Sequence, residues 1–325
     1  MKKRIIFFLI LLVSFRIFAD YKSEYDNLLS ARNVKGIAAL LPKWEKAEPK
    51  NPELYIAYFN YYLLKGQRST QSLDTYKKDN TNSLALVDQK TNKIAGYLNN
   101  NIWYEKEDVD KALSYLEKGL KFGKNRLDMY FGRIHILGEI GEYEKQSQKI
   151  IEVLKLGKEI NHKWLWSMNE VIPSSESEHF FLISINEYYK NWLQKSSPQT
   201  LNAAEKTGEA QLKLYPKNIE VHNYLSLAYI GQGKFKEALN VLLKADKLAN
   251  EDYVIIFNMG RCYEALKQYD KAKECYLRMK KNPNKQVQDM ADQKLSELKK
   301  INQIVYKKTC NRYQAKTPIT RYLNP

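Results

Sequence analysis

Residues 228–245 read AYIGQGKFKEALNVLLKA, and residues 258–276 read NMGRCYEALKQYDKAKECY. Around these stretches, matching residues lie 34 positions apart: Leu225 and Met259, Tyr229 and Tyr263, Phe235 and Tyr269, Ala238 and Ala272, Leu242 and Tyr276. A 34-residue period in which large and small side chains recur in a fixed order is typical of a unit of two helices joined by a turn. Such a unit cannot bury its apolar face alone, so we expect it to stack against neighbouring units.

The better-defined unit starts near Ile219 and turns at residues 231–233, which read GQG. Small residues at Ala228, Ala238 and Ala245 allow its two helices to approach closely, and larger residues fill the space beside them. The next unit starts at Tyr253 and ends at residues 282–284, an Asn-Pro-Asn sequence that stops a helix.

Residues 219–284 resemble the tetratricopeptide repeat, with departures at Ser226, Lys267 and Met279. The resemblance implies an all-α solenoid, a right-handed superhelix of helix-turn-helix repeats. It also implies a concave face, lined by the first helix of each repeat, that binds a peptide or protein. The positions that match this face are Asn223, Leu227, Ile230, Phe257, Arg261 and Glu264. Leu227 stands where the family's clamp for C-terminal carboxylates needs an Asn, so the resemblance does not extend to that specialised role.

Weaker copies of the pattern extend the array in both directions. They occur at residues 48–66, 110–125, 127–156 and 185–218. We therefore expect an N-terminal array over residues 20–160 and a C-terminal array over residues 185–305. Residues 285–305 form one amphipathic helix, suited to cap the apolar face of the last repeat. The basic residues 306–325 show no periodicity and are expected to form a tail.

Two segments interrupt the repeats. Residues 67–98 form the first, in which the polar residues 67–83 predict a loop and residues 84–98 favour a β-hairpin over an irregular helix. The second is a connecting insertion at residues 161–184, which carries Trp164 and Trp166. These two rings form either an exposed aromatic patch for sugars or a partner, or a buried plug between layers. We favour the plug, because large aromatic side chains are usually buried.

Residues 1–19 have the features of an export signal. A basic start, Lys2 to Arg4, precedes an apolar run at residues 5–15, which is shorter than the roughly 20 residues that span a bilayer. Ala19 offers a cleavage position. A lipid anchor is not expected, because no Cys lies near this position. We expect a cleaved signal peptide, a chain without a transmembrane segment, and a periplasmic or secreted location.

The chain carries a formal charge of +16, and the four basic residues of the predicted signal leave +12 on the mature chain. Lys greatly outnumbers Arg, whereas proteins that read nucleic acids favour Arg. Export also separates the chain from most nucleic acid. We therefore expect no nucleic-acid partner, while an acidic polymer of the cell envelope stays open.

The sequence contains no HExxH, no phosphate-binding Gly-rich loop, no Gly-x-Ser-x-Gly and no pair of CxxC motifs. His162, His179 and Glu170 match no usual spacing of zinc ligands, so we expect no metal and no cofactor. Cys262 and Cys275 lie on facing helices, where they either form a disulfide or serve as small apolar residues. Cys310 is then left over, either as a free thiol on the tail or in a contact with another molecule.

The sequence thus predicts a non-catalytic scaffold or adaptor of the bacterial cell envelope. Its partner is a peptide or protein segment on the concave face, since the repeats provide a surface and no reactive group. The alternative is a protein that binds cell-wall polysaccharide or peptidoglycan through its lysines and the Trp164–Trp166 patch.

Overall fold

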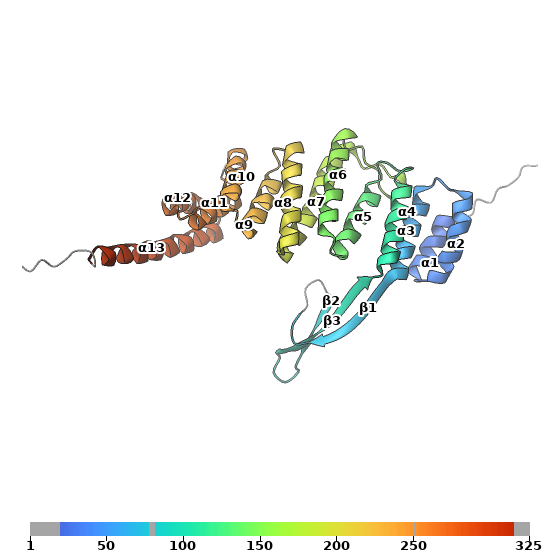
Figure 1. Ribbon diagram of the computed structural model, residues 1–325, viewed down its shortest axis with the longest axis horizontal. Helices are drawn as coiled ribbons and strands as arrows, with labels where there is room; N and C mark the ends of the chain where they lie inside the picture. The colour runs from blue at the N-terminus through green and yellow to red at the C-terminus, as the bar shows by residue number, and fades with distance from the viewer. Residues whose placement is uncertain (1–19, 78–81, 250, 315–325) are drawn as a thin grey trace, which may run out of the picture. The chain divides into compact units, whose positions relative to one another are not determined.

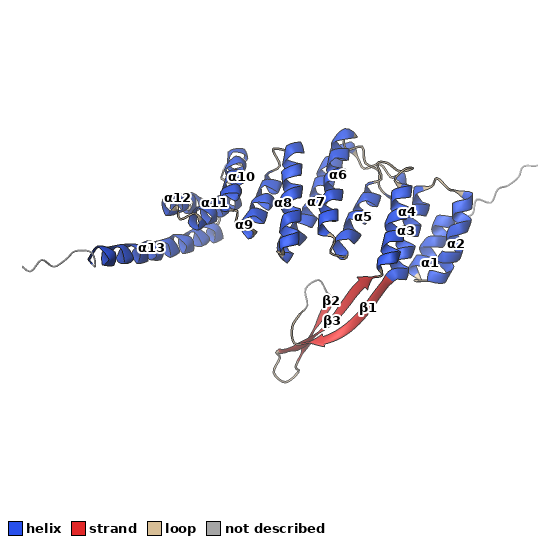
Figure 2. Ribbon diagram, viewed as in Figure 1, coloured by secondary structure: helices blue, strands red, loops and turns tan. Residues whose placement is uncertain are grey.

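The computed structural model describes residues 20–77, 82–249 and 251–314, so the predicted signal peptide at residues 1–19 lies outside the described residues. The described residues form thirteen α-helices, one short 3-10 helix and a three-stranded antiparallel sheet (Figure 2). The chain divides into two compact units, residues 1–124 and residues 125–325. The predicted fold class, a stack of helix pairs with a small β insertion, is confirmed. None of the described helices is long and apolar enough to cross a membrane.

The N-terminal unit pairs short helices around aromatic side chains. Its helices are α1 (Tyr21–Ser30), α2 (Val34–Ala47), α3 (Pro52–Gly66) and α4 (Lys106–Gly119). Asn51 caps α3 by accepting a hydrogen bond from the Glu53 N–H, and Pro52 occupies the first helical position. The Tyr58 and Tyr115 rings stack with their centroids 4.0 Å apart, which joins α3 to α4.

A three-stranded sheet lies between α3 and α4 in the sequence. Its strands, in the order β1-β3-β2, are β1 (Gln67–Asp74), β2 (Asn82–Val87) and β3 (Ile94–Tyr104). The predicted hairpin is confirmed as β2 and β3, but the loop prediction is wrong over residues 67–74, which form β1, and over residues 82–83, which start β2. All eight residues of β1 pair with β3, although their side chains are mostly polar and exposed. A strand that buries so few side chains shows no apolar alternation in its sequence.

The C-terminal unit continues the helix pairs. Its helices are α5 (Leu127–Glu139), α6 (Tyr143–Glu159), α7 (Ser174–Lys195), α8 (Pro198–Leu214), α9 (Ile219–Gly231), α10 (Phe235–Leu248), α11 (Tyr253–Ala265), α12 (Tyr269–Met279) and α13 (Lys285–Gln314), with the 3-10 helix at Ser167–Asn169. From α7 onward each helix packs against the next (Figure 1). The helices α7, α9 and α11 also contact one another in turn, as expected when equivalent helices of stacked repeats form one layer.

The boundaries of the predicted insertion and tail differ from those in the structure. Residues 174–184 belong to α7, which starts directly after Pro173 with the sequence SSESE. Ser and Glu are favoured in the first turn of a helix, and a preceding Pro marks its start. The last helix, α13, continues past residue 305 to Gln314, because residues 306–314 contain neither Gly nor Pro. The rest of the predicted tail, residues 315–325, lies outside the described residues.

The division between the two units also differs from the predicted one. It falls after Lys124, whereas the sequence places the connecting insertion at residues 161–184. The reason is that α6 packs along α8, and the loop after α6 is held by the buried Trp164. The helices α5 and α6 therefore belong to the C-terminal unit.

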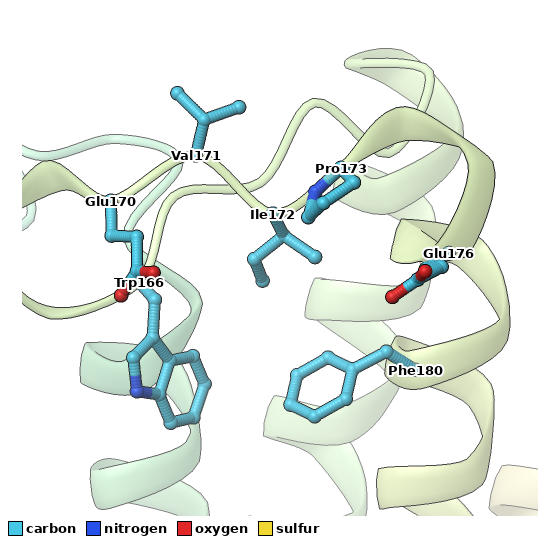
Figure 3. Close-up of a pocket in the computed structure, with 7 residues that line it drawn as sticks. All are labelled: Trp166, Glu170, Val171, Ile172, Pro173, Glu176 and Phe180. Atoms are coloured by element: carbon cyan, nitrogen blue, oxygen red, sulfur yellow. The ribbon is translucent and has the colours of Figure 1, made fainter.

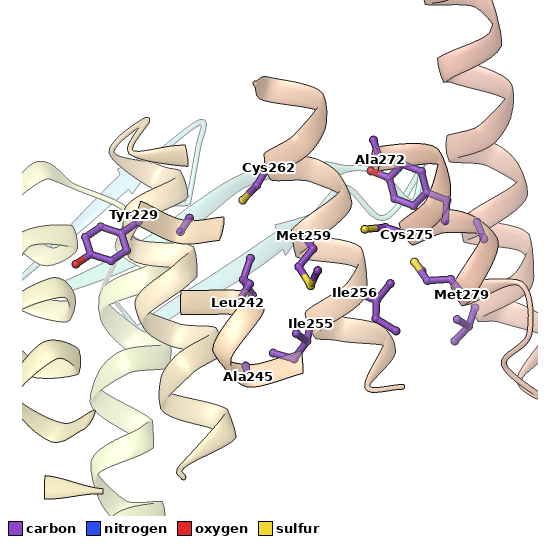
Figure 4. Close-up of a cluster of buried hydrophobic side chains, with 14 of the residues drawn as sticks. Tyr229, Leu242, Ala245, Ile255, Ile256, Met259, Cys262, Ala272, Cys275 and Met279 are labelled. Carbon is purple, nitrogen blue, oxygen red and sulfur yellow. The ribbon is translucent and has the colours of Figure 1, made fainter. Parts of the chain in front are cut away.

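The repeat positions form the core between α9 and α13. Ala238, Leu242, Ala245 and Ala272 are fully buried, and Leu242, Met259 and Met279 belong to the same cluster of buried apolar side chains (Figure 4). Small residues at the helix contacts allow the larger ones to interdigitate at the density of a protein interior. The 34-residue spacing therefore reflects the same side-chain contacts recurring in successive helix pairs.

Gly260 allows the closest of these approaches. A Cβ atom at this position would lie 2.6 Å from the Tyr276 ring, which is fully buried. We expect Gly260→Ala to lower the free energy of unfolding by about 1–3 kcal/mol, although Ala is intrinsically better than Gly in a helix by about 1 kcal/mol. Urea denaturation followed by circular dichroism would measure the change, with the exposed Ser296→Ala as the control. A Gly260→Ala chain more stable than the wild type would contradict this packing.

Candidate partner-binding surface

Hydrogen bonds link α9 and α11 on one side of the C-terminal unit. The Asn258 Nδ2 donates to the Asn223 Oδ1 over 2.9 Å, and an Arg261 Nη donates to the Asn258 Oδ1 over 3.3 Å. The Arg261 guanidinium also lies over the Phe257 ring, 6.0 Å from its centroid. These contacts place polar side chains from two successive repeats on one continuous surface.

The structure places the six predicted residues as follows. Asn223, Leu227 and Ile230 are half-buried on α9, Phe257 and Glu264 are half-buried on α11, and Arg261 is exposed on α11. Ile230, Arg261 and Glu264 line a common hollow of about 360 Å³, together with Phe235, Ala265, Tyr269 and Lys294. We refer to Asn223, Leu227, Ile230, Phe257, Asn258, Arg261 and Glu264 as the α9–α11 surface.

Charges at this hollow are partly paired. The Glu264 carboxylate accepts a hydrogen bond from the Tyr276 hydroxyl over 2.8 Å and lies 3.9 Å from the Lys294 Nζ. Burial, followed by this bond to Glu264, raises the pKa of Tyr276, so the hydroxyl stays protonated and keeps donating. Arg261 makes no ion pair with any described residue. Its guanidinium can therefore donate hydrogen bonds to a carboxylate or carbonyl oxygen of a partner at this hollow.

The sequence pattern did not point to two contributors to this surface and its hollow, Asn258 and Lys294. Asn258 lies one position beyond the residues that match the family's groove, yet it connects Asn223 to Arg261. Lys294 comes from α13. The sequence predicts α13 as a capping helix whose polar face is exposed to solvent, whereas Lys294 on this helix lines the hollow. Upstream, the Asn186 Nδ2 donates to a Glu220 carboxylate oxygen, which joins α7 to α9 in the same way that Asn258 joins α11 to α9.

Trp164 and Trp166 do not form a joint aromatic patch. Trp164 is fully buried, with its ring 6.0 Å from Tyr130 and 5.3 Å from Phe181. Trp166 is half-buried and lines a separate hollow of about 220 Å³, where its ring meets the Phe180 ring edge-on at 5.7 Å (Figure 3). Trp164 therefore fills the space where the helices meet. Of the two Trp side chains, only Trp166 is accessible to solvent.

The remaining candidates for chemistry are not arranged for reaction. Cys262 and Cys275 are buried free thiols. They do not form the disulfide that was one of the two alternatives. Burial raises the pKa of each thiol to about 11, which keeps both protonated and weakly nucleophilic at neutral pH. Among the described residues, no group of three or more His, Cys, Asp or Glu side chains could hold a metal ion.

A family model described as tetratricopeptide repeat matches residues 229–292, from the end of α9 into α13. The match shows tetratricopeptide repeat sequence in this segment, where the 34-residue period is clearest. No curated protein matches it.

Solved structures provide weaker similarities. The TPR domain of P58(IPK) is 13% identical over 87% of this chain and 66% of that chain, with a TM-score of 0.31. YrrB, described as a TPR protein with an unusual peptide-binding site, is 12% identical over 78% of this chain and 97% of its own, with a TM-score of 0.35. Yeast Tom70 is 12% identical over 98% of this chain and 71% of its own, with a TM-score of 0.31. These scores are low, so the fold assignment depends on the repeat match and on the helix pairs themselves.

Proposed function

We propose that this chain is a non-catalytic adaptor of the cell envelope that binds an extended peptide or protein segment on the α9–α11 surface. The supporting observation is the hydrogen-bonded series Asn223, Asn258 and Arg261 beside a hollow with apolar walls. No cofactor and no nucleic acid take part.

An extended peptide matches this surface chemically. The half-buried amide side chain of Asn223 offers a donor and an acceptor, as a peptide backbone does, while the buried Asn258 bonds to Asn223 and Arg261 and fixes both. Ile230, Phe235 and Tyr269 provide the apolar walls into which one side chain of a bound peptide would fit. The guanidinium of Arg261 sets the orientation, because it binds carbonyl or carboxylate oxygens and does not bind amide N–H groups.

Export is supported by the sequence of residues 1–19, which has a basic start and a short apolar run. If the signal is cleaved, mass spectrometry of the protein purified from its own cells will find an N-terminus near Asp20. An intact N-terminus on protein from the cytosol would contradict the proposed location.

The alternative, a protein that binds a cell-wall polymer, gains little from the structure. Trp164 is buried, and the hollow beside Trp166 carries the carboxylates of Glu170 and Glu176. Carboxylates repel acidic polymers, so this hollow does not attract them. A peptide or protein partner is therefore the better-supported function.

The α9–α11 surface can be tested with peptides selected from a random phage-displayed library on the immobilised full chain. We expect selected peptides to bind the wild type and to lose at least about tenfold in affinity, or about 1.4 kcal/mol, with the Arg261→Glu and Phe257→Ala double variant. The measurement is fluorescence anisotropy, and the matched control is Lys273→Glu, an exposed position on α12. Equal affinity of wild type and double variant would show that the α9–α11 surface is not the binding site.

A further inference from the structure

A second and larger hollow lies between α8 and α10. Its volume is about 710 Å³, and its floor comes from α9 through the buried residues His222, Leu225 and Tyr229. None of these residues belongs to the α9–α11 surface. Because residues along a helix are separated by about 100°, the two sets occupy different faces of α9. We call this hollow the α8–α10 groove.

The walls of the α8–α10 groove are apolar near the floor. Leu212 lies on the α8 side, and Val241 and Leu248 lie on the α10 side. Leu248 is 42% exposed, although it is a large apolar residue. Val241 and Leu248 are seven residues apart, which is two turns of one helix, so they present an apolar stripe along the groove. The volume is large enough for several side chains.

Lysines surround this apolar interior. Lys213 on α8 and Lys244 and Lys247 on α10 line the groove, and all three are exposed. None of their ammonium groups makes an ion pair or a hydrogen bond with any residue that the structure describes. Lys244 and Lys247 are three residues apart on one helix, where like charges repel. The groove lining holds one carboxylate, Glu209, which accepts a hydrogen bond from the Tyr229 hydroxyl over 2.6 Å; three lysines against one carboxylate leave the lining with a net positive charge.

We propose that the α8–α10 groove binds an acidic amphipathic helix of a partner protein, independently of the α9–α11 surface. An apolar interior bordered by cations is complementary to a helix with apolar residues on one face and carboxylates beside them. The apolar face would pack on Leu212, Val241 and Leu248, while the carboxylates pair with Lys213, Lys244 and Lys247. An acidic polymer without apolar groups could satisfy the lysines only, and the apolar residues would stay exposed to water.

The test uses the full chain and a labelled peptide of about 18 residues, long enough to match α8, with Leu at helical spacing and Glu at the other positions. We expect this peptide to bind, and a peptide of the same composition in scrambled order to bind at least about tenfold more weakly. The triple variant Lys213→Glu, Lys244→Glu and Lys247→Glu should lower affinity for the ordered peptide by at least about tenfold. Leu248→Ser should lower it by a smaller factor without loss of fold, since Leu248 is partly exposed.

The matched control is a second triple variant with the same change in net charge, Lys155→Glu, Lys273→Glu and Lys299→Glu, at exposed positions outside the groove. It should bind the ordered peptide nearly as the wild type does. Equal binding of ordered and scrambled peptides, or of poly-glutamate, would show attraction by charge alone and overturn the proposal. Equal losses in the two triple variants would also overturn it. Arg261→Glu should leave this binding unchanged, so failure here is distinguishable from failure of the α9–α11 surface.

Discussion

Trp164→Ala is expected to lower the free energy of unfolding by about 3–5 kcal/mol, the usual range for a fully buried aromatic residue. The ring is fully buried and meets Tyr130 edge-on and Phe181 at a tilt. Its removal leaves a cavity where the loop after α6 joins the helix layer, and large cavities in rigid surroundings cannot close completely. Urea denaturation of the full chain, followed by circular dichroism at 222 nm, would measure the loss.

Trp166→Ala is the matched control, because it removes the same side chain two residues away. Trp166 is half-buried at the edge of its hollow, so its loss should cost about 1 kcal/mol. Both variants should keep peptide binding at the α9–α11 surface. Similar losses of stability in the two variants would show that Trp164 does not fill the join between the helices.

The helix pairs between Ile219 and Met279 could be predicted because their packing is periodic. Ala238 and Ala272 are both fully buried, and they occupy equivalent positions in neighbouring repeats. When the same contact recurs every 34 residues, each copy confirms the register of the other. The sequence therefore predicts both the helices and the residues that face the core.

The strand β1 could not be predicted in the same way. Its stability comes from backbone pairing with β3 along all eight residues, and backbone groups are the same in every sequence. Its only large apolar side chain, Leu73, is 70% exposed. Neither apolar alternation nor burial marks this segment, so a polar loop is the natural expectation from its sequence.

The candidate site was predictable in part. Arg261 and Ile230 follow from their positions on the first helix of each repeat, and both line the hollow. Asn258 could not be predicted, because its contact with Asn223 depends on how α9 and α11 are rotated against each other. A small rotation changes which of two adjacent residues reaches the neighbouring helix. The role of Lys294 likewise depends on where α13 packs.

Asp128→Ala is expected to lower the free energy of unfolding by about 3–5 kcal/mol, although Asp128 itself is partly exposed. The Arg126 side chain is fully buried, and the Asp128 carboxylate accepts two hydrogen bonds from its guanidinium, from Nε over 2.9 Å and from an Nη over 2.7 Å. Another Nη of Arg126 donates to the Asn169 Oδ1 over 3.3 Å, in the loop that carries Trp166. Removal of the carboxylate takes away the two charged hydrogen bonds that it accepts from the buried Arg126 guanidinium, and the loss of such contacts is costly in a low-dielectric interior.

Arg126→Met should be less damaging than Asp128→Ala, with a loss of about 1–2 kcal/mol. Met fills part of the same volume without a charge, and the Asp128 carboxylate that remains lies in the first turn of α5, where the helix dipole stabilises it. The double variant Arg126→Met and Asp128→Ala should be close in stability to Arg126→Met alone, because the buried charge is absent from both. Urea denaturation of the three variants measures this order. If Arg126→Met is the most damaging of them, the guanidinium contributes mainly through its contacts with the Asn169 loop, and the account of Asp128 as its essential counter-ion fails.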